Sequence, residues 1–199
     1  MSGFHASAAR LTLAEELMLL ALDDRSGVVV GLQPYALELG VTAALVMELT
    51  LEGRIDTDLE KVFLLSDRPT GTALLDEVQA EIAAGPASQP VRFWLTRLSQ
   101  PGPALIQRVT RSLVDRGVLR LVENRLLWVF KTRVYPPASG LEEREVKSRI
   151  LALLNSDDIP APRDALLVGL LRATGLIDQL LAAPEGSPLH ARIDQLADL

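Results

Sequence analysis

Residues Pro34–Leu51 read PYALELGVTAALVMELTL, a long helical pattern near the start of the chain. Apolar side chains recur every four positions in it, at Leu37, Val41, Leu45 and Leu49. This spacing is typical of the buried stripe of an α-helix. We therefore expect a long core helix here and a mostly helical fold around it.

The segments on either side of this helix carry similar patterns. Thr12 and Glu15 form a capping box, in which each side chain can bond an exposed amide at the start of a helix. Residues 165–171 are apolar on nearly all sides, and we predict that they form the central helix of a bundle. Further helices are predicted over residues 72–84, 91–99, 103–116 and 141–155, and near Leu176 and Leu189.

Short apolar runs between these helices indicate a few strands. Residues 28–30 predict one short strand, and residues 55 and 62–65 predict two more pieces. A hairpin is expected from residues 118–122 and 125–130, with Glu123 and Asn124 near its turn. The predicted fold class is all-α: a single mainly helical domain over residues 11–199, built around a hydrophobic central helix, with one projecting β-hairpin. Residues 1–10 are expected to be a flexible N-terminus.

Composition limits the class of protein. The chain has 199 residues, 48% of them hydrophobic and 23% charged, which is typical of a globular protein. It has no cysteine, which excludes disulfides and thiolate chemistry. The longest uninterrupted aliphatic run, residues 165–171, is too short to span a bilayer. We therefore expect a cytoplasmic protein whose membrane contact is peripheral.

Charge is distributed unevenly along this chain, whose formal net charge is −6. Between Arg92 and Arg133 nine basic residues stand against two acidic ones, so this window carries +7 and the remainder −13. Five of the eight aromatic residues lie in the window or just beyond it. Basic and aromatic side chains together indicate a surface for an anionic partner, either a lipid headgroup layer or nucleic acid. Solvated arginines around an ordinary core would give the same pattern.

The sequence offers little for catalysis. Its two histidines, His5 and His190, lack nearby carboxylates at the spacing of a metal site. The turn at residues 67–71 has one glycine and lacks the Lys-Ser or Lys-Thr pair of a phosphate-binding loop. Glu15 and Glu16 are adjacent, so on a helix they point in different directions. We therefore predict no catalytic residue, no metal site and no cofactor, and expect that the protein is not an enzyme.

The order of elements in the basic window leaves two binding functions open. A helix, then Gly117, then a hairpin is also the order of the last helix and wing of a winged helix-turn-helix protein. Arg108 and Arg111 are three residues apart and share one face of that helix. Either an anionic lipid or DNA could bind such a face.

The predicted hairpin favours lipid. On its second strand Leu126, Trp128 and Phe130 alternate to one face, and residues 127 and 129, also apolar, go to the other. A strand that is apolar on both faces must be buried in the core, buried in an oligomer or inserted at a membrane interface, where tryptophan is well suited. The wing of a DNA-binding protein is usually polar and basic, so nucleic acid is the disfavoured partner.

Two groups of residues form the candidate site. The residues expected to bind anionic lipid are Arg108, Arg111, Arg116, Arg120 and Arg125. Those expected to contact a membrane or another subunit are Leu126, Trp128, Phe130, Lys131 and Arg133. The favoured function is a peripheral membrane adaptor. The alternatives are a winged-helix DNA-binding protein and an oligomeric scaffold whose hairpin is buried between subunits.

Four blocks of sequence, in the same order, resemble the Golgi phosphoprotein 3 family. The blocks are LTLAEEL at residues 11–17 with LALDD at 20–24, MELTLEGRI at 47–55, DRPTG at 67–71 with LLDE at 74–77, and LVDRGVL at 113–119. Each block alone would be weak evidence. Together they cover most of the chain from Leu11 to about Leu181.

The resemblance implies a mainly helical fold with a hydrophobic central helix and a projecting hairpin. It also implies a peripheral membrane protein that recognises a phosphoinositide, phosphatidylinositol 4-phosphate, and that uses the hairpin in oligomerisation and membrane contact. Protein clients of the family include the cytosolic tails of Golgi enzymes. Anionic lipid, a second copy of the chain and protein clients are therefore the expected partners.

This chain departs from the family at the headgroup pocket, which in Golgi members uses a tryptophan and three arginines. An ungapped alignment of the flanking blocks places these positions at Gln33, Thr42, Pro103 and Ile106. None of the four matches, so the resemblance does not carry the pocket residues over. Arg108 and Arg111, about one turn further along the same predicted helix, are the candidates for a different anion pocket.

Overall fold

The computed structural model describes residues 10–23, 26–29, 33–58, 61–126, 130–181 and 188–197. The helices are α1 (Leu13–Leu20), α2 (Pro34–Leu51), α3 (Ala73–Ala84), α4 (Val91–Leu98), α5 (Pro103–Asp115), α6 (Leu141–Leu154), α7 (Pro162–Thr174), α8 (Leu176–Leu181) and α9 (Pro188–Ala197). The strands are β1 (Ile55–Thr57), β2 (Val62–Leu64), β3 (Val122–Leu126) and β4 (Phe130–Val134). The all-α class with a hairpin is confirmed, and the predicted helix over residues 34–51 has the bounds of α2.

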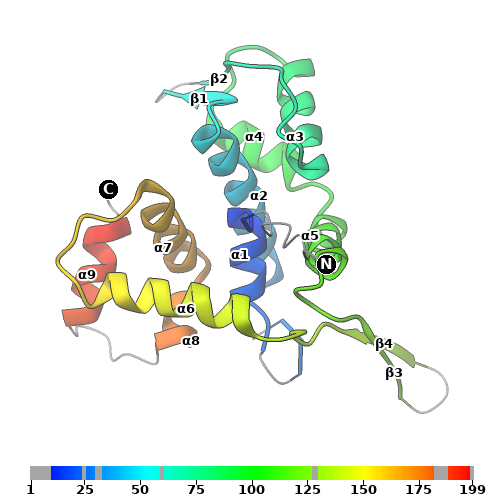
Figure 1. The fold of residues 1–199 in the computed structure, drawn as a ribbon. Helices are drawn as coiled ribbons and strands as arrows, with labels where there is room; N and C mark the ends of the chain where they lie inside the picture. The colour runs from blue at the N-terminus through cyan, green and yellow to red at the C-terminus, as the bar shows by residue number, and fades with distance from the viewer. Residues whose placement is uncertain are drawn as a thin grey trace, which may run out of the picture.

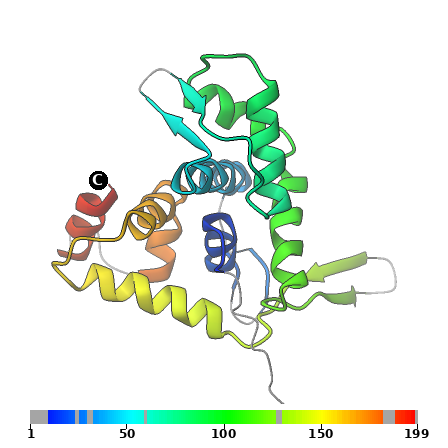
Figure 2. The same cartoon turned by 45° about the horizontal axis from the view of Figure 1, so that its top comes forward.

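The hydrophobic central helix is α1. All eight of its residues are buried, and it packs against α2, α5, α6 and α7, which surround it in Figure 2. The prediction that residues 165–171 form the central helix was wrong. These residues lie in α7, where Ala165, Leu166 and Gly169 are only half-buried. Helix α7 lies between α2 and α9 (Figure 1). An apolar run shows that one face of a helix is buried, but only a helix that is covered on every side, as α1 is, lies at the centre.

The capping box at the start of α1 is confirmed. The Thr12 N–H donates to Glu15 Oε2 at 2.8 Å, and the Glu15 N–H donates to Thr12 Oγ1 at 3.2 Å. These bonds satisfy amides that a helix start leaves without partners. The first turn of the central helix is therefore fixed by its own sequence.

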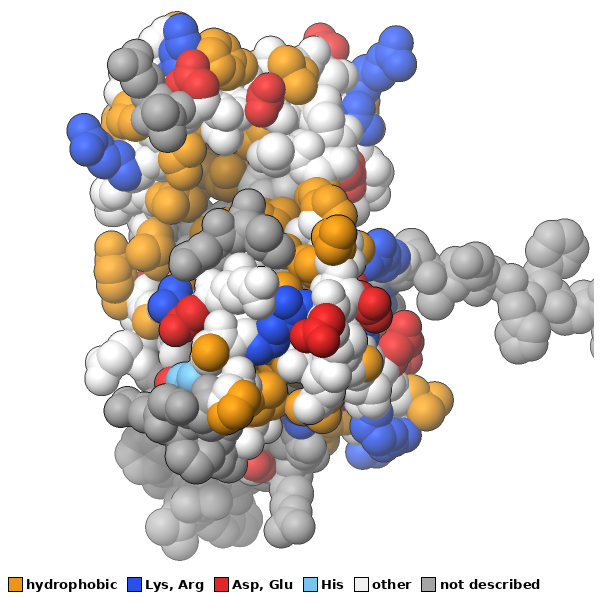
Figure 3. Space-filling view, turned by 90° about the vertical axis from the view of Figure 1, so that its left-hand side faces the viewer, with side chains coloured by type: hydrophobic (Ala, Val, Ile, Leu, Met, Phe, Trp, Pro, Cys, Tyr) orange, Lys and Arg blue, Asp and Glu red, His pale blue; other side chains and the backbone are white. Residues whose placement is uncertain are grey.

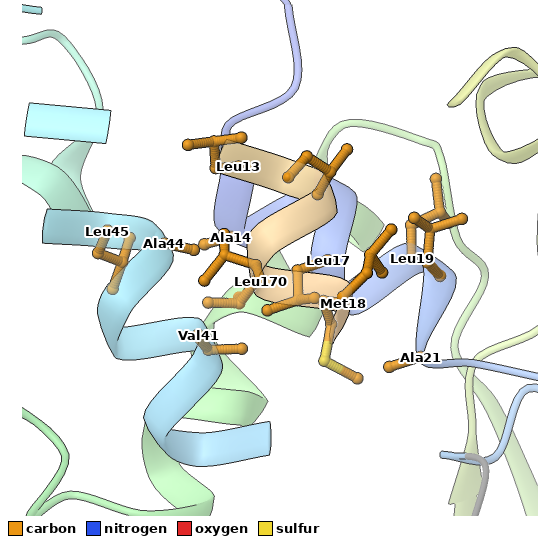
Figure 4. Packing of buried hydrophobic residues seen from close by; sticks show 14 of the residues in the cluster. Leu13, Ala14, Leu17, Met18, Leu19, Ala21, Val41, Ala44, Leu45 and Leu170 are labelled. Atoms are coloured by element: carbon orange, nitrogen blue, oxygen red, sulfur yellow. The ribbon is translucent and has the colours of Figure 1, made fainter. Parts of the chain in front are cut away.

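The core is a layer of aliphatic side chains between α1, α2 and α7. Figure 4 shows Leu17 and Met18 of α1 lying beside Val41 of α2 and Leu170 of α7, all of them buried. The three helices approach closely at Gly40, where a Cβ atom would stand 2.4 Å from Thr174 Cγ2 and 3.3 Å from Leu17 Cδ2. Glycine is required there because real atoms do not approach so closely.

Helix α2 is long and apolar enough to cross a bilayer by length and composition alone. The sequence expectation did not foresee this, because it considered only the longest uninterrupted aliphatic run, residues 165–171. Half of this 18-residue window is buried inside the protein. The helix contacts α1, α3, α4, α5, α7 and β1. Its apolar composition is thus explained by its place in the core.

The hairpin β3–β4 projects from the body next to the end of α5 (Figure 1). Its predicted strand bounds were wrong. Leu126 pairs with Phe130, and Glu123 pairs with Arg133, so Glu123 and Asn124 lie inside β3 instead of at the turn. Leu126 and Phe130 therefore face each other across two strands and do not alternate along one. Charged and apolar residues alternate too weakly in this segment to fix the register from sequence.

Two other strand expectations had different outcomes. Residues 55 and 62–65 do supply strands, since β1 and β2 form a second small antiparallel pair in which Ile55 faces Leu64. The strand predicted at residues 28–30 is not formed over the described part of that segment. Val29 makes only an isolated bridge with Leu22, and residue 30 lies outside the described residues.

Candidate anion-binding site

An open pocket of about 710 Å³ lies between α5, the start of α3 and the root of the hairpin. Four of the candidate arginines line it: Arg108, Arg111, Arg116 and Arg133. The lining also includes Thr72, Ala73, Leu74, Gln107, Ser112, Asp115, Leu121 and Tyr135. Residues more than 60 positions apart thus meet at one surface, which we call the arginine pocket.

The amphipathic pattern of α5 directs two of these arginines into the pocket. Leu105, Val109 and Leu113 recur every four residues and are buried in the core. Arg108 and Arg111 lie on the exposed side of the same helix, as their spacing predicted. Burial of the apolar stripe therefore fixes the direction of the basic face.

The start of α3 forms one side of the pocket, through Thr72, Ala73 and Leu74. Thr72 is the N-cap residue, and its side chain makes no capping hydrogen bond. The first amides of a helix carry partial positive charge and attract anions. The preceding turn is held by Asp76, which accepts hydrogen bonds from Thr70 N–H at 2.6 Å and Thr70 Oγ1 at 2.7 Å. These bonds lower the pKa of Asp76 below its ordinary value of 3.8.

Three pocket arginines are paired with exposed carboxylates. Arg108 pairs with Glu77 of α3, and both side chains are about half exposed. Arg111 Nε lies 2.9 Å from Asp115 Oδ1, one turn along α5. Arg133 Nε lies 3.8 Å from Glu123 Oε1 across the hairpin. Exposed pairs of this kind contribute only about 0–1 kcal/mol, so an incoming anion can compete for these arginines.

The fourth arginine has a structural partner. Arg116 Nη1 donates to Glu15 Oε2 at 2.6 Å, and the Glu15 side chain is only 4% exposed. Ser112 Oγ donates to the other oxygen of Glu15 at 2.7 Å. Withdrawing Arg116 would leave a buried carboxylate without its cation, which is strongly unfavourable. Arg116 therefore forms a fixed wall of the pocket.

Glu15 belongs to a larger set of buried charges around the start of α1. Glu16, as expected, points away from Glu15, and its Oε1 accepts from Arg149 Nη2 at 2.8 Å. Arg163 Nη1 donates to Glu48 Oε1 at 2.6 Å, and the other oxygen of Glu48 accepts from the Leu13 N–H at 2.6 Å. These contacts join α1 to α2, α6 and α7, and sequence reasoning did not find them because the partners are far apart in the chain.

The remaining candidate residues lie elsewhere or are only partly described. Arg120 precedes β3, and its Nη2 lies 3.5 Å from the Pro137 carbonyl oxygen, outside the lining of the arginine pocket. Arg125 pairs with Lys131 in the hairpin ladder, and Leu126 with Phe130. The side chains of these four residues, and Trp128 as a whole, lie outside the described residues.

Exposed aliphatic side chains surround the root of the hairpin. Leu121 lines the arginine pocket and is 40% exposed, and Val122 beside it is 37% exposed. The α1–α2 segment is tied to this root because the Tyr135 N–H donates to the Gly27 carbonyl oxygen at 3.0 Å. The next residues, Val28 and Val29, are also exposed. We call these four aliphatic residues, 28, 29, 121 and 122, the hairpin-root collar.

The four positions that the resemblance assigns to the headgroup pocket do not form a cationic site here. Thr42 is buried, and its Oγ1 donates to the Glu38 carbonyl oxygen at 2.8 Å. The Glu38 carboxylate lies against Gly102, 3.4 Å from where a Cβ atom would stand. A carboxylate therefore lies next to Pro103, and the positive side chains are found further along α5.

The structure gives no support for a metal centre. Within the described ranges, no group of three or more His, Cys, Asp or Glu side chains could hold a metal ion. His190 Nε2 lies 3.3 Å from Asp178 Oδ1 on the C-terminal helices, away from the arginine pocket. Sequence reasoning missed the start of α3, which lines the pocket, and Glu77, which pairs with the lining residue Arg108. The turn at residues 67–71 was the signal that placed a helix start there.

Comparison with known proteins agrees with this fold. The model of the family described as Golgi phosphoprotein 3 (GPP34) matches residues 13–198. Vacuolar protein sorting-associated protein 74 of Eremothecium gossypii is 31% identical over 170 residues, which cover 72% of this chain and 49% of that protein. The chain thus spans about half the length of this relative. Because the family match extends over nearly the whole chain, the protein belongs to the Golgi phosphoprotein 3 family.

Proposed function

We propose that this protein is a peripheral membrane adaptor that binds anionic lipid headgroups in the arginine pocket. The observation that carries the proposal is the convergence of four arginines and a helix start beside the exposed hairpin-root collar. Arginines near an anionic membrane each contribute on the order of 1 kcal/mol of attraction. The adaptor would act without catalysis, at the cytoplasmic face of a membrane, with phosphoinositide as one headgroup class to test.

The hairpin-root collar supports lipid over DNA. Leu121 belongs both to the arginine pocket and to the collar, so an exposed aliphatic side chain stands beside the pocket arginines. A bilayer presents anionic headgroups above acyl chains and matches such a surface, whereas the backbone of DNA offers mainly phosphates. Among the described residues on the side that carries α6, α7 and α9, acidic and basic side chains are interspersed, and no region of one sign stands out there (Figure 3).

Vesicle flotation with charge-reversed variants tests the proposal. The protein should float with phosphatidylcholine vesicles that contain phosphatidylglycerol or phosphoinositide, and flotation should fall as salt rises because the attraction is screened. Arg108→Glu with Arg111→Glu should reduce vesicle partitioning by about tenfold or more. The matched control is Arg92→Glu with Arg172→Glu, which reverses two exposed arginines that do not line the pocket.

Two results would contradict the proposal. One is equal flotation of the pocket variant and the wild type while both remain folded by circular dichroism. The other is salt-sensitive retention on duplex DNA without binding to anionic vesicles, which would favour the winged-helix alternative. Light scattering of the wild-type protein tests whether it is also an oligomer.

A further inference from the structure

Two arginines of the pocket are already paired with carboxylates of the chain itself. Glu77 reaches Arg108 from α3, and Asp115 reaches Arg111 from the next turn of α5. A carboxylate thus stands where a headgroup phosphate would bind each of the two arginines. Neither pair is needed to stabilise a buried charge, because all four side chains are about half exposed or more.

These two exposed pairs differ from the pair between Arg116 and Glu15. There the carboxylate is buried and also accepts a hydrogen bond from Ser112, so Arg116 cannot exchange it for an outside anion without a large penalty. At Arg108 and Arg111 water already screens the attraction, and the partners can separate easily. The pocket therefore has one fixed cation, Arg116, and three exchangeable ones, of which Arg108 and Arg111 share one face of α5.

Resting on the proposed function, we propose that Glu77 and Asp115 are intramolecular competitors that set how much negative charge a membrane must carry before the protein binds. A headgroup can use Arg108 or Arg111 only after it displaces a carboxylate that has the same charge as a phosphodiester. An isolated monoanionic lipid therefore gains little by exchange. A densely charged surface, or a headgroup with several charges, displaces both carboxylates at once and binds.

Removing one competing carboxylate should raise the affinity of the protein for anionic vesicles. Glu77→Gln should increase partitioning onto phosphatidylcholine vesicles with a low fraction of phosphatidylglycerol by about threefold. Adding Asp115→Asn should raise it by about threefold again. The gain should be greatest at a low fraction of phosphatidylglycerol and vanish when the vesicles are highly charged.

Glu81→Gln is a matched control. Glu81 is also on α3, one turn after Glu77, and it pairs with an arginine outside the pocket: Arg97 Nε lies 2.9 Å from Glu81 Oε1. Both substitutions change the net charge by the same amount. An equal gain from Glu81→Gln would show a general charge effect and overturn the proposal.

A double-mutant cycle makes the test specific to the pair. In an Arg108→Gln background, Glu77→Gln should give no gain, because the cation that it competes for has gone. A gain that persists in this background would overturn the proposal. If wild-type protein ignores anionic vesicles altogether, the proposed function itself fails. If it binds through Arg108 and Arg111 but Glu77→Gln changes nothing, only the competition fails.

Discussion

At the scale of single residues, burial separates arginines that look equivalent in the sequence. Arg111 and Arg116 lie five positions apart on the same helix end, and both line the arginine pocket. The carboxylate partner of Arg111 is 63% exposed, while that of Arg116 is 4% exposed. The first pair is available for binding, and the second holds α5 to the start of α1.

This difference predicts a difference in stability. Arg116→Met should lower the free energy of unfolding by roughly 2–3 kcal/mol, less than for a fully buried pair because Arg116 keeps contact with water. Arg111→Met should change it by less than about 1 kcal/mol. Urea unfolding followed by circular dichroism measures both. Equal values for the two variants would show that the Glu15 pair is not a structural contact.

The turn before α3 gives a prediction for pH. Because hydrogen bonds from Thr70 depress the pKa of Asp76 in the folded state, the ionised carboxylate stabilises the fold above its unfolded pKa of about 3.8. This stabilisation is lost as the pH falls through the folded pKa. Asp76→Asn should therefore destabilise the protein at neutral pH, and its deficit relative to wild type should shrink in acid. Urea unfolding at a series of pH values measures this difference in the free energy of unfolding, with Asp194→Asn as the exposed control. A difference between Asp76→Asn and wild type that stays constant across the pH range would contradict the prediction.

At the scale of elements, helix contacts decide which glycines matter. Gly40 of α2 faces Thr174 of α7, whose Oγ1 is held by hydrogen bonds to the Leu170 and Leu171 carbonyl oxygens. Gly169 of α7 has no atom within 4 Å of the place where a Cβ would stand. Both are helix-interior glycines, and from sequence alone they are indistinguishable.

Alanine at these two positions should act in opposite directions. Gly40→Ala should destabilise by about 1–3 kcal/mol through overpacking, despite the better helix propensity of alanine. Gly169→Ala should stabilise by roughly 0.5–1 kcal/mol, because its methyl group meets no neighbour. Thermal unfolding would measure both, and Thr174→Ala should relieve part of the Gly40→Ala penalty. Stabilisation by Gly40→Ala would show that the helices separate without cost.

At the scale of the whole molecule, the basic window divides into parts with different roles. Arg108 and Arg111 reach the arginine pocket from α5, and Arg133 reaches it from β4. Arg97 instead pairs with Glu81, one turn further along α3 than Glu77, and neither residue lines the pocket. The strongly acidic remainder of the chain repels an anionic membrane, so binding would orient the protein with the hairpin side toward the surface.

The sequence by itself determined the helices, the capping box and the shared face of Arg108 and Arg111. These depend on interactions between residues three or four positions apart, which a linear pattern records directly. Family membership could also be inferred, because four blocks in order carry enough information. The hairpin register could not be derived, since it depends on pairing across a turn that the residue pattern does not mark.

Only the tertiary structure decided that α1 is the central helix and that Arg116 is held by Glu15. A helix is central when neighbours cover all of its sides, as they cover α1. The charge of Arg116 matters because its partner, about 100 positions earlier in the chain, is buried. Likewise, no residue near Arg108 in the sequence predicts its pairing with Glu77, which reaches it from another helix. Long-range packing sets which charges meet and how much water screens them, and on that depends whether an arginine binds a partner or stabilises the fold.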